Sequence, residues 1–136
     1  MHDIITRPGV APLPGTRTRI TVTTTAERTI VTIAGELDMA VTGRFAAQLD
    51  EELSLTPRAL IIDLTRLGFC AARGLTVVLD AVATAHAAGI PVAVVADGRP
   101  VLRPVRALGL ERALPLHRSL TDAQEWLGIA VFAKEQ

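Results

Sequence analysis

Two unbroken apolar runs constrain the fold more than any other feature of this chain. They read ALIIDL at residues 59–64 and PVAVVA at residues 91–96. Strands with such continuous apolar character are usually covered on both faces, as they are in parallel sheets. The two runs therefore predict central strands of a mostly parallel or mixed sheet with helices packed against it.

Helical periodicity separates these runs from their neighbours. Apolar residues recur at every fourth position of segment 41–54 (Val41, Phe45, Leu49 and Leu53). This stripe predicts a helix with its three consecutive acids, residues 50–52, turned to water. A second stripe predicts a helix over about 73–88. A third helix is expected at about 99–108, and a fourth begins after Ser119, which is placed to cap it.

The remaining strands complete an alternating order. Segments 17–25 and 29–35 are rich in β-branched residues and predict a hairpin, with the first strand at an edge or with one wet face. A short strand is expected at 113–116. The resulting order, β-β-α-β-α-β-α-β-α, is typical of a single α/β domain.

Composition narrows the classes of protein. A chain of 136 residues, 49% of them hydrophobic, suits one domain with a sizeable core. Zero formal net charge gives no sign of a nucleic-acid or membrane-surface partner. A single cysteine allows neither an internal disulfide nor a zinc site, which agrees with a reducing cytoplasm. No stretch resembles a signal peptide or approaches the ~20 apolar residues of a membrane span.

Nucleophilic catalysis needs a hydroxyl or thiol beside a base. The two serines, Ser54 and Ser119, stand at predicted helix ends, and none of the three histidines has a candidate partner. Cys70 is a reactive thiol only if a helix N-terminus lowers its pKa, and burial as a small apolar residue is the favoured alternative. We therefore expect no enzyme activity, no cofactor and no metal.

Charge is distributed unevenly along the chain. Residues 36–63 hold six acidic residues against two arginines, a balance of minus four, and residues 99–118 hold five arginines against one glutamate, a balance of plus four. Solvated surfaces explain both segments, and that interpretation is favoured. An oriented surface that selects a charged partner is the alternative.

Two local features stand at predicted helix starts. In GELD, residues 35–38, the acids Glu36 and Asp38 precede the first helix, where carboxylates are favourable and where Asp38 can act as a cap. Arg73 begins the second helix, the unfavourable end for a cation. Tolerating an exposed cation there costs only about 0.3–1 kcal/mol, so Arg73 needs no partner; the alternatives are a pair with Glu36 or Asp38, or an acidic protein partner.

These residues fall into a pattern that resembles a known family. The succession TIVTIAGELDMA (29–40), ALIIDLTRLGF-x-x-x-x-GL (59–75) and GIPVAVVADG (89–98) is similar to the STAS domain of bacterial anti-sigma factor antagonists. The resemblance runs from about residue 17 to 127. It implies a mixed four- to five-stranded sheet with helices mainly on one face. We expect an N-terminal arm at 1–16, the STAS domain at 17–128 and a C-terminal tail at 129–136.

The resemblance also implies a function. Antagonists of this family are non-enzymatic switch proteins that bind an anti-sigma factor, usually a serine kinase of the histidine-kinase-like ATPase fold. The kinase phosphorylates the serine of a D-S-[ST]-G-L motif, and the phosphorylated form releases its partner. Here the motif falls on Ala71, Ala72, Arg73, Gly74 and Leu75. Ala72 therefore stands at the phosphorylation position without a hydroxyl.

The family's partner-binding positions map onto the two loops that precede the predicted helices. They are Glu36, Asp38, Cys70, Ala71, Ala72, Arg73, Gly74 and Thr76. The expected partner is an anti-sigma factor or serine kinase in the bacterial cytoplasm, with neither nucleic acid nor a membrane span involved, and a homodimer stays open. The alternative is a STAS-type scaffold or ligand-sensing subunit of a signalling or lipid-transport complex, in which the arginines of 99–118 meet an anionic ligand.

Overall fold

The computed structural model describes residues 5–8 and 17–135, which form six strands and four helices. The strands are β1 (Ile5–Pro8), β2 (Arg19–Thr24), β3 (Thr29–Leu37), β4 (Leu60–Cys70), β5 (Val92–Val95) and β6 (Leu116–His117). The helices are α1 (Thr42–Ser54), α2 (Ala72–Ala87), α3 (Arg99–Ala107) and α4 (Leu120–Glu135).

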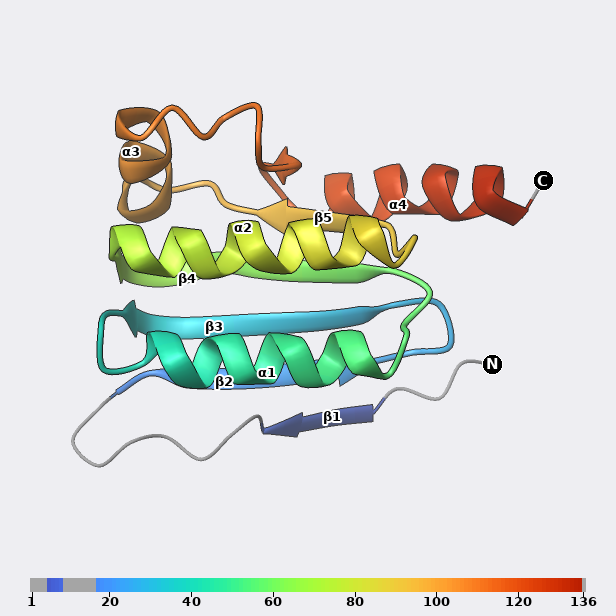
Figure 1. Cartoon of the computed structure of the whole chain (residues 1–136), viewed down its shortest axis with the longest axis horizontal. Helices are drawn as coiled ribbons and strands as arrows, with labels where there is room; N and C mark the ends of the chain where they lie inside the picture. Colours follow the sequence, from blue (N-terminus) through green and yellow to red (C-terminus); the bar gives the residue numbers. More distant parts are fainter. Residues whose placement is uncertain (1–4, 9–16, 136) are drawn as a thin grey trace.

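All six strands form one sheet in the order β1-β2-β3-β4-β5-β6 (Figure 1). The first three pair antiparallel, and β3 to β6 pair in parallel. This confirms an α/β fold with a mixed sheet. The additional strand is β1, which lies within the segment assigned to the N-terminal arm and pairs outside β2.

The predicted β2–β3 hairpin is confirmed, and its turn is closed by the Thr25 N–H, which donates to the Arg28 carbonyl at 2.9 Å. The edge position expected for the first strand is wrong, because β1 lies beyond it. The alternative of one wet face holds: Ile20 and Val22 are buried, whereas Arg19 is exposed and Thr21 is only half-buried. A strand that pairs on both sides still alternates when only one of its faces is covered by a helix.

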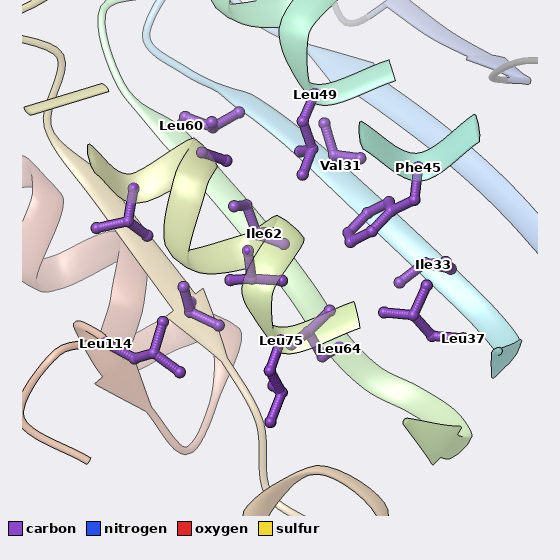
Figure 2. Packing of buried hydrophobic residues seen from close by; sticks show 14 of the residues in the cluster. Val31, Ile33, Leu37, Phe45, Leu49, Leu60, Ile62, Leu64, Leu75 and Leu114 are labelled. Atoms are coloured by element: carbon purple, nitrogen blue, oxygen red, sulfur yellow. The ribbon is translucent and has the colours of Figure 1, made fainter. Parts of the chain in front are cut away.

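The main core lies between the sheet and the two helices α1 and α2, which run side by side over β3 and β4 (Figure 1). Figure 2 shows Phe45 of α1 and Leu75 of α2 among the aliphatic side chains of the strands, such as Ile33 and Ile62. Each fully buried side chain of this kind contributes about 1.5–3 kcal/mol to folding. All four residues of the predicted α1 stripe are buried in this cluster, as expected.

The helix α4 covers the opposite face. Its residues Ala123 and Leu127 form a second cluster with Ile61 of β4 and with Ala93 and Val95 of β5. Successive side chains of a strand point to opposite faces, so these residues face away from α1 and α2. Most helices thus lie on one face, as predicted. The helix α4 extends to Glu135, through most of the segment assigned to a C-terminal tail.

One of the three acids expected to face water does not. Glu52 is only 2% exposed, and its Oε2 accepts a hydrogen bond from Nε2 of the equally buried Gln48 at 2.8 Å. The two residues are one helical turn apart, so both lie on the same side of α1. The periodic pattern identified the apolar stripe correctly, but it did not show how wide the buried face of α1 is.

The strand β4 is longer than the apolar run that predicted it, and it carries two register shifts against β3. Between Thr32 and Ala34 of β3, and again just after Gly35, β4 contributes one residue more than its partner. Such bulges change which face the following side chain takes. The residues of β4 that face the core are therefore spaced irregularly: Leu60, Ile62, Leu64, Leu67 and Cys70.

Beyond Asp63, the strand β4 pairs with β3 but not with β5. The strand β5 pairs with residues Leu60–Asp63 and ends before the second half of β4. The helix α3 packs beside β4 beyond the end of β5 (Figure 1), with Val101 and Val105 buried in the main core. The predicted strand at 113–116 is shorter and later than expected, since β6 contains only Leu116 and His117.

Candidate functional site

The carboxyl ends of β3 and β4 bring together the two loops that hold the predicted binding residues. Leu37 and Cys70 are register partners at the ends of these parallel strands. The Ala71 N–H then donates to the Leu37 carbonyl at 2.9 Å. The turn that leads into α1 and the start of α2 are thus joined by the backbone itself.

Gly74 makes this junction tight. A Cβ atom at this position would lie 2.6 Å from both Cγ and Cδ2 of Leu37, closer than real side chains approach. Leu37 is fully buried, so it has little room to move. The first turn of α2 can rest on β3 only because residue 74 has no side chain. Gly74 therefore supports the loop from within and does not offer surface to a partner.

The backbone of Glu36 is held from the other side by Thr18. The Thr18 hydroxyl donates to the Glu36 carbonyl at 2.7 Å, and the Glu36 N–H donates back to the hydroxyl oxygen at 3.3 Å. Gly35 adopts a φ of 108° with an ideal Cβ only 3.0 Å from the Thr18 Cα, so a larger residue does not fit there. The exposed Glu36 side chain is consequently carried on a fixed backbone.

Asp38 organises the turn before α1. Its Oδ1 accepts the Ala40 N–H at 3.0 Å, and its carbonyl accepts the N–H groups of Val41 and Thr42, each at 3.1 Å. The predicted role as helix cap is therefore corrected: Asp38 closes the turn, whereas α1 begins after Val41 with no side-chain cap. The carboxylate of Asp38 stays half-exposed at the end of the sheet.

The start of α2 offers small side chains and one cation. Ala71 precedes the helix in an extended conformation without a side-chain cap, and Ala72 and Arg73 of the first turn are exposed. The Thr76 hydroxyl is exposed and donates to the Ala72 carbonyl at 3.4 Å. Within the part of the chain that the structure describes, no ion pair joins Arg73 to Glu36.

Strand geometry explains why that pair does not form. Leu37 and Cys70 face the core under α1 and α2, so the preceding residues, Glu36 and Phe69, face the other side of the sheet. Glu36 and Phe69 are themselves register partners and lie side by side there. Arg73 belongs to the helix on the opposite face.

Cys70 is only 6% exposed and belongs to the main core. This burial raises the pKa of its thiol from 9.0 to about 11, because desolvation disfavours the thiolate. At neutral pH the group is a neutral thiol, and the helix N-terminus beside it does not overcome the effect of burial. The interpretation of Cys70 as a small apolar core residue is confirmed.

Two exposed apolar residues were missed by sequence reasoning. Met39 is 66% exposed in the turn after Asp38, and Phe69 is 50% exposed beside Glu36. The second register shift of β4 turns Phe69 outward and places Cys70 inside. Leu67 and Phe69 keep a two-residue apolar period, so the sequence of this strand contains no signal for the outward position of Phe69.

We call the exposed and half-exposed residues at these strand and helix ends the end surface. It consists of Glu36, Asp38, Met39, Phe69, Ala72, Arg73 and Thr76. It combines two acids, two apolar side chains and one cation on a backbone fixed by hydrogen bonds, which is a composition suited to a protein partner. Across the described ranges, no three metal-ligating side chains come together and no helix is long and apolar enough to span a bilayer.

Comparisons with known proteins agree with this geometry. The family described as "Mlab, STAS domain" matches residues 20–120. The anti-sigma-F factor antagonist RsfB of Mycobacterium tuberculosis is 30% identical over 94 residues, which cover 69% of this chain and 76% of RsfB.

Solved structures give the same picture. An anti-sigma factor antagonist from Mycobacterium paratuberculosis is similar with a TM-score of 0.74 and 26% identity, over 86% of this chain and 98% of that one. RsbS of Moorella thermoacetica shares the fold, with a TM-score of 0.70 and 18% identity over 82% of this chain and 96% of its own. The match to the family over most of the described residues, together with the similarity to RsfB, shows that the chain belongs to the STAS domain family.

Proposed function

We propose that this chain is a non-enzymatic regulator of the anti-sigma factor antagonist kind, which binds an anti-sigma factor or serine kinase through the end surface and is not switched off by phosphorylation there. The similarity to RsfB and to the mycobacterial antagonist structure supports the general role. The observation that supports the proposal is the junction of β3 and β4, where the hydrogen bond from the Ala71 N–H to the Leu37 carbonyl joins the two loops that hold the predicted binding residues.

The chemistry of the end surface supports a protein partner. Met39 and Phe69 supply apolar area that the fold itself does not use. Glu36 and Asp38 supply negative charge on rigid backbone, which costs little entropy to hold in a bound position. A partner protein with a small apolar pocket beside a positively charged residue would complement these groups.

The hydroxyl groups near the start of α2 support a protein that is not switched by phosphorylation there. Residue 72 is an alanine, which cannot accept a phosphoryl group. The two nearest threonines along the chain have internal partners: Thr76 donates to the Ala72 carbonyl, and Thr65 donates to Oδ1 of Asp63 at 2.7 Å. A phosphoserine at this position would add a charge of about −1.5 to −2 to the end surface. Without it, binding depends on the amounts of the two proteins.

Calorimetric titration with each anti-sigma factor of the source organism tests the binding. One of them is expected to bind wild-type protein, and Phe69→Ala is expected to weaken that complex at least tenfold. Leu55→Ala is the control, because Leu55 is also an exposed large apolar residue (64%, against 50% for Phe69) but stands at the C-terminal end of α1, away from the end surface. Equal affinities for the two variants would exclude the end surface as the binding site.

Phosphorylation is tested separately by incubating the bound kinase with ATP and analysing the protein by mass spectrometry. Wild-type protein is expected to carry no phosphate on residues 70–76. The triple variant Ala71→Asp, Ala72→Ser, Arg73→Ser restores the family motif and is expected to become phosphorylated. Phosphate on the wild-type segment would overturn the proposal, as would a triple variant that binds normally but stays unmodified.

A second candidate function is a STAS scaffold or ligand-sensing subunit of a larger complex. It is favoured by the description of the matching family, which names Mlab, and not by the end surface. Size-exclusion chromatography of the affinity-purified native protein distinguishes the two functions. A stable assembly without any anti-sigma factor would favour this second candidate.

A further inference from the structure

Part of the sheet face that carries α4 is left open to solvent. The helix α4 packs over β5 and the first half of β4, where Ile61, Ala93 and Val95 are buried beneath it. The same face of β2, β3 and the far half of β4 carries exposed and half-exposed side chains instead. We call this part the open face. Its residues are Arg19, Thr21, Thr32, Ala34, Glu36, Arg66 and Phe69.

Two exposed arginines flank a small residue on the open face. Arg19 of β2 and Arg66 of β4 are both register partners of Ala34 in β3. Neighbouring strands are about 4.7–4.9 Å apart, so the Cα atoms of the two arginines are separated by about 10 Å. Only the methyl group of Ala34 lies between them. A single carboxylate placed over Ala34 can therefore accept hydrogen bonds from both guanidinium groups.

The charges of the open face are not paired within the molecule. Across residues 5–8 and 17–135, no ion pair is recorded for Arg19 or Arg66. Glu36 stands on the same face two residues after Ala34, and it has no recorded ion pair either. The two cations repel each other in the free protein, and a carboxylate brought between them would remove that repulsion.

A second copy of the chain can supply this carboxylate. Glu36 lies about 6.6 Å from Ala34 along β3, at the usual rise of a strand. A two-fold axis that crosses β3 at Gly35 therefore brings Glu36 of each copy over Ala34 of the other. The same rotation brings Phe69, the register partner of Glu36, over Arg66 of the other copy. A guanidinium group over an aromatic ring is a favourable contact, and the symmetry makes each contact occur twice.

From these observations we propose that the chain forms a homodimer in which the open faces of two copies pack against each other. Glu36 of each copy lies between Arg19 and Arg66 of the other. The occupant is a second copy because the open face carries both members of each charge pair, at positions that a single two-fold axis exchanges. The contact is mostly polar with one aromatic side chain, a composition typical of reversible association.

The dimer has a consequence for the function proposed above. Glu36 and Phe69 also belong to the end surface, so the dimer would cover part of the surface that binds the partner protein. Self-association and partner binding would then exclude each other. This consequence rests on the proposed function, whereas the dimer itself does not. In a chain with an alanine at position 72, self-association would limit the amount of free binding surface as the concentration rises.

Sedimentation velocity of the full chain measures the association, over concentrations from about 10 µM to about 1 mM. The average mass of wild-type protein is expected to rise toward twice that of one chain. Wild-type protein that stays monomeric throughout would overturn the proposal. If that monomer binds a poly-glutamate peptide and loses the binding in Arg19→Glu, Arg66→Glu, the open face would instead serve an acidic protein partner.

Two charge-reversed variants test the arrangement itself. Glu36→Arg places a cation against two arginines, and Arg19→Glu, Arg66→Glu places two carboxylates against Glu36. Each variant alone is expected to associate more weakly than wild type by about tenfold or more. An equimolar mixture of the two is expected to recover dimers, because both symmetry-related contacts then join opposite charges. The recovery also shows that the variants are folded, since all three positions are exposed.

The matched control replaces the second variant by Arg106→Glu, Arg112→Glu, which makes the same change in net charge at exposed positions outside the open face. This control is expected to associate with itself as wild type does. Its mixture with Glu36→Arg should form mixed dimers at least several-fold more weakly than the mixture above. Equal association of the two mixtures would mean unspecific attraction of net charge and would overturn the proposal. Self-association that persists in both charge-reversed variants would place the interface elsewhere and would also overturn it.

These measurements contain no anti-sigma factor, so their outcome is independent of the function proposed for the end surface. A dimer without any anti-sigma factor binding would leave the present inference intact and remove the proposed function. Binding of an anti-sigma factor by a chain that stays monomeric would do the opposite.

Discussion

Two strand-to-helix junctions differ in how they use the same backbone arrangement. At the β4–α2 junction, Gly74 packs against Leu37 and the exposed residues are mostly small. At the β5–α3 junction, Gly98 has only Pro100 nearby and the following helix presents arginines around a hollow. The first junction is tight and nearly neutral, whereas the second is open and charged.

This difference shows that tight packing and a cluster of surface charges occur at two different junctions of the molecule. The β4–α2 junction has the rigid geometry of a recognition surface, but Arg73 is its only charged side chain, and Ala71 and Ala72 add no polar group. The β5–α3 junction has the charge but no comparable packing contact. Substitutions at the first junction should therefore change the stability of the fold, and substitutions at the second should change it little.

The largest contrast is expected between two leucines. Leu37→Ala should lower the free energy of unfolding by about 2–5 kcal/mol, because it leaves a cavity beneath the β4–α2 junction. Leu102→Ala, in the wall of the hollow beside α3, should cost about 1 kcal/mol, because its side chain is only half-buried. Urea denaturation measures both values. Equal losses would remove the distinction between a tight and an open junction.

The two junction glycines give the next contrast. Gly74→Ala should cost about 1–3 kcal/mol, because the added Cβ overlaps Leu37. At Gly98 the added Cβ would lie 3.4 Å from the Pro100 Cδ, and the φ of −117° suits any residue, so Gly98→Ala should cost no more than about 0.5 kcal/mol. The melting temperatures of the two variants provide the check, and a larger loss at Gly98 would contradict the comparison.

The thiol of Cys70 predicts a pH dependence at the tight junction. Its folded pKa of about 11 lies above the value of 9.0 for the unfolded chain, so the folded state retains the proton between these values. Stability should therefore fall as pH rises from 9 to 11, by about 1.4 kcal/mol at pH 10. The free energy of unfolding of Cys70→Ala, measured by denaturation at each pH, should not show this decrease. An equal decrease in the wild-type protein and in Cys70→Ala would mean that other titrating groups cause it.

The smallest effect is expected at the open junction. Arg103→Gln should raise stability by about 0.2–0.5 kcal/mol for each repulsive pair that it removes on α3. The gain should shrink at 1 M salt, where exposed charges are screened. Arg112→Gln, outside the helix, should leave stability unchanged. Urea denaturation at low and high salt compares the two, and a loss of stability in Arg103→Gln would mean that this arginine is already paired in solution.

Patterns of neighbouring residues in the sequence predicted most of the fold. The apolar runs at 59–64 and 91–96 became β4 and β5, and the stripe at 41–54 became α1. These predictions succeeded because each depends on one period within one element. The burial of Glu52 depends instead on the width of the contact between α1 and the rest of the core, which no single period reports.

The position of the two candidate loops could be predicted from the sequence, but the exposure of the side chains around them could not. The two loops were identified from their motifs, and the structure places them together. The outward position of Phe69 follows from a bulge that arises only when β4 pairs with β3, so the sequence of β4 alone could not indicate it. The hollow of about 170 Å³ beside α3 depends on segments 96–106 and 111–118 meeting in space, which no local pattern in the sequence can indicate.

The unequal lengths of β4 and β5 have a consequence for solubility. Past Asp63, β4 has no strand on its β5 side, and an uncovered strand edge is a template for pairing with another chain. The helix α3 occupies that side, so it acts as a shield for the edge as well as a carrier of the arginines. Its like charges also repel a second copy that approaches this edge. The exposed arginines of α3 thus discourage the molecule from aggregating through its own sheet.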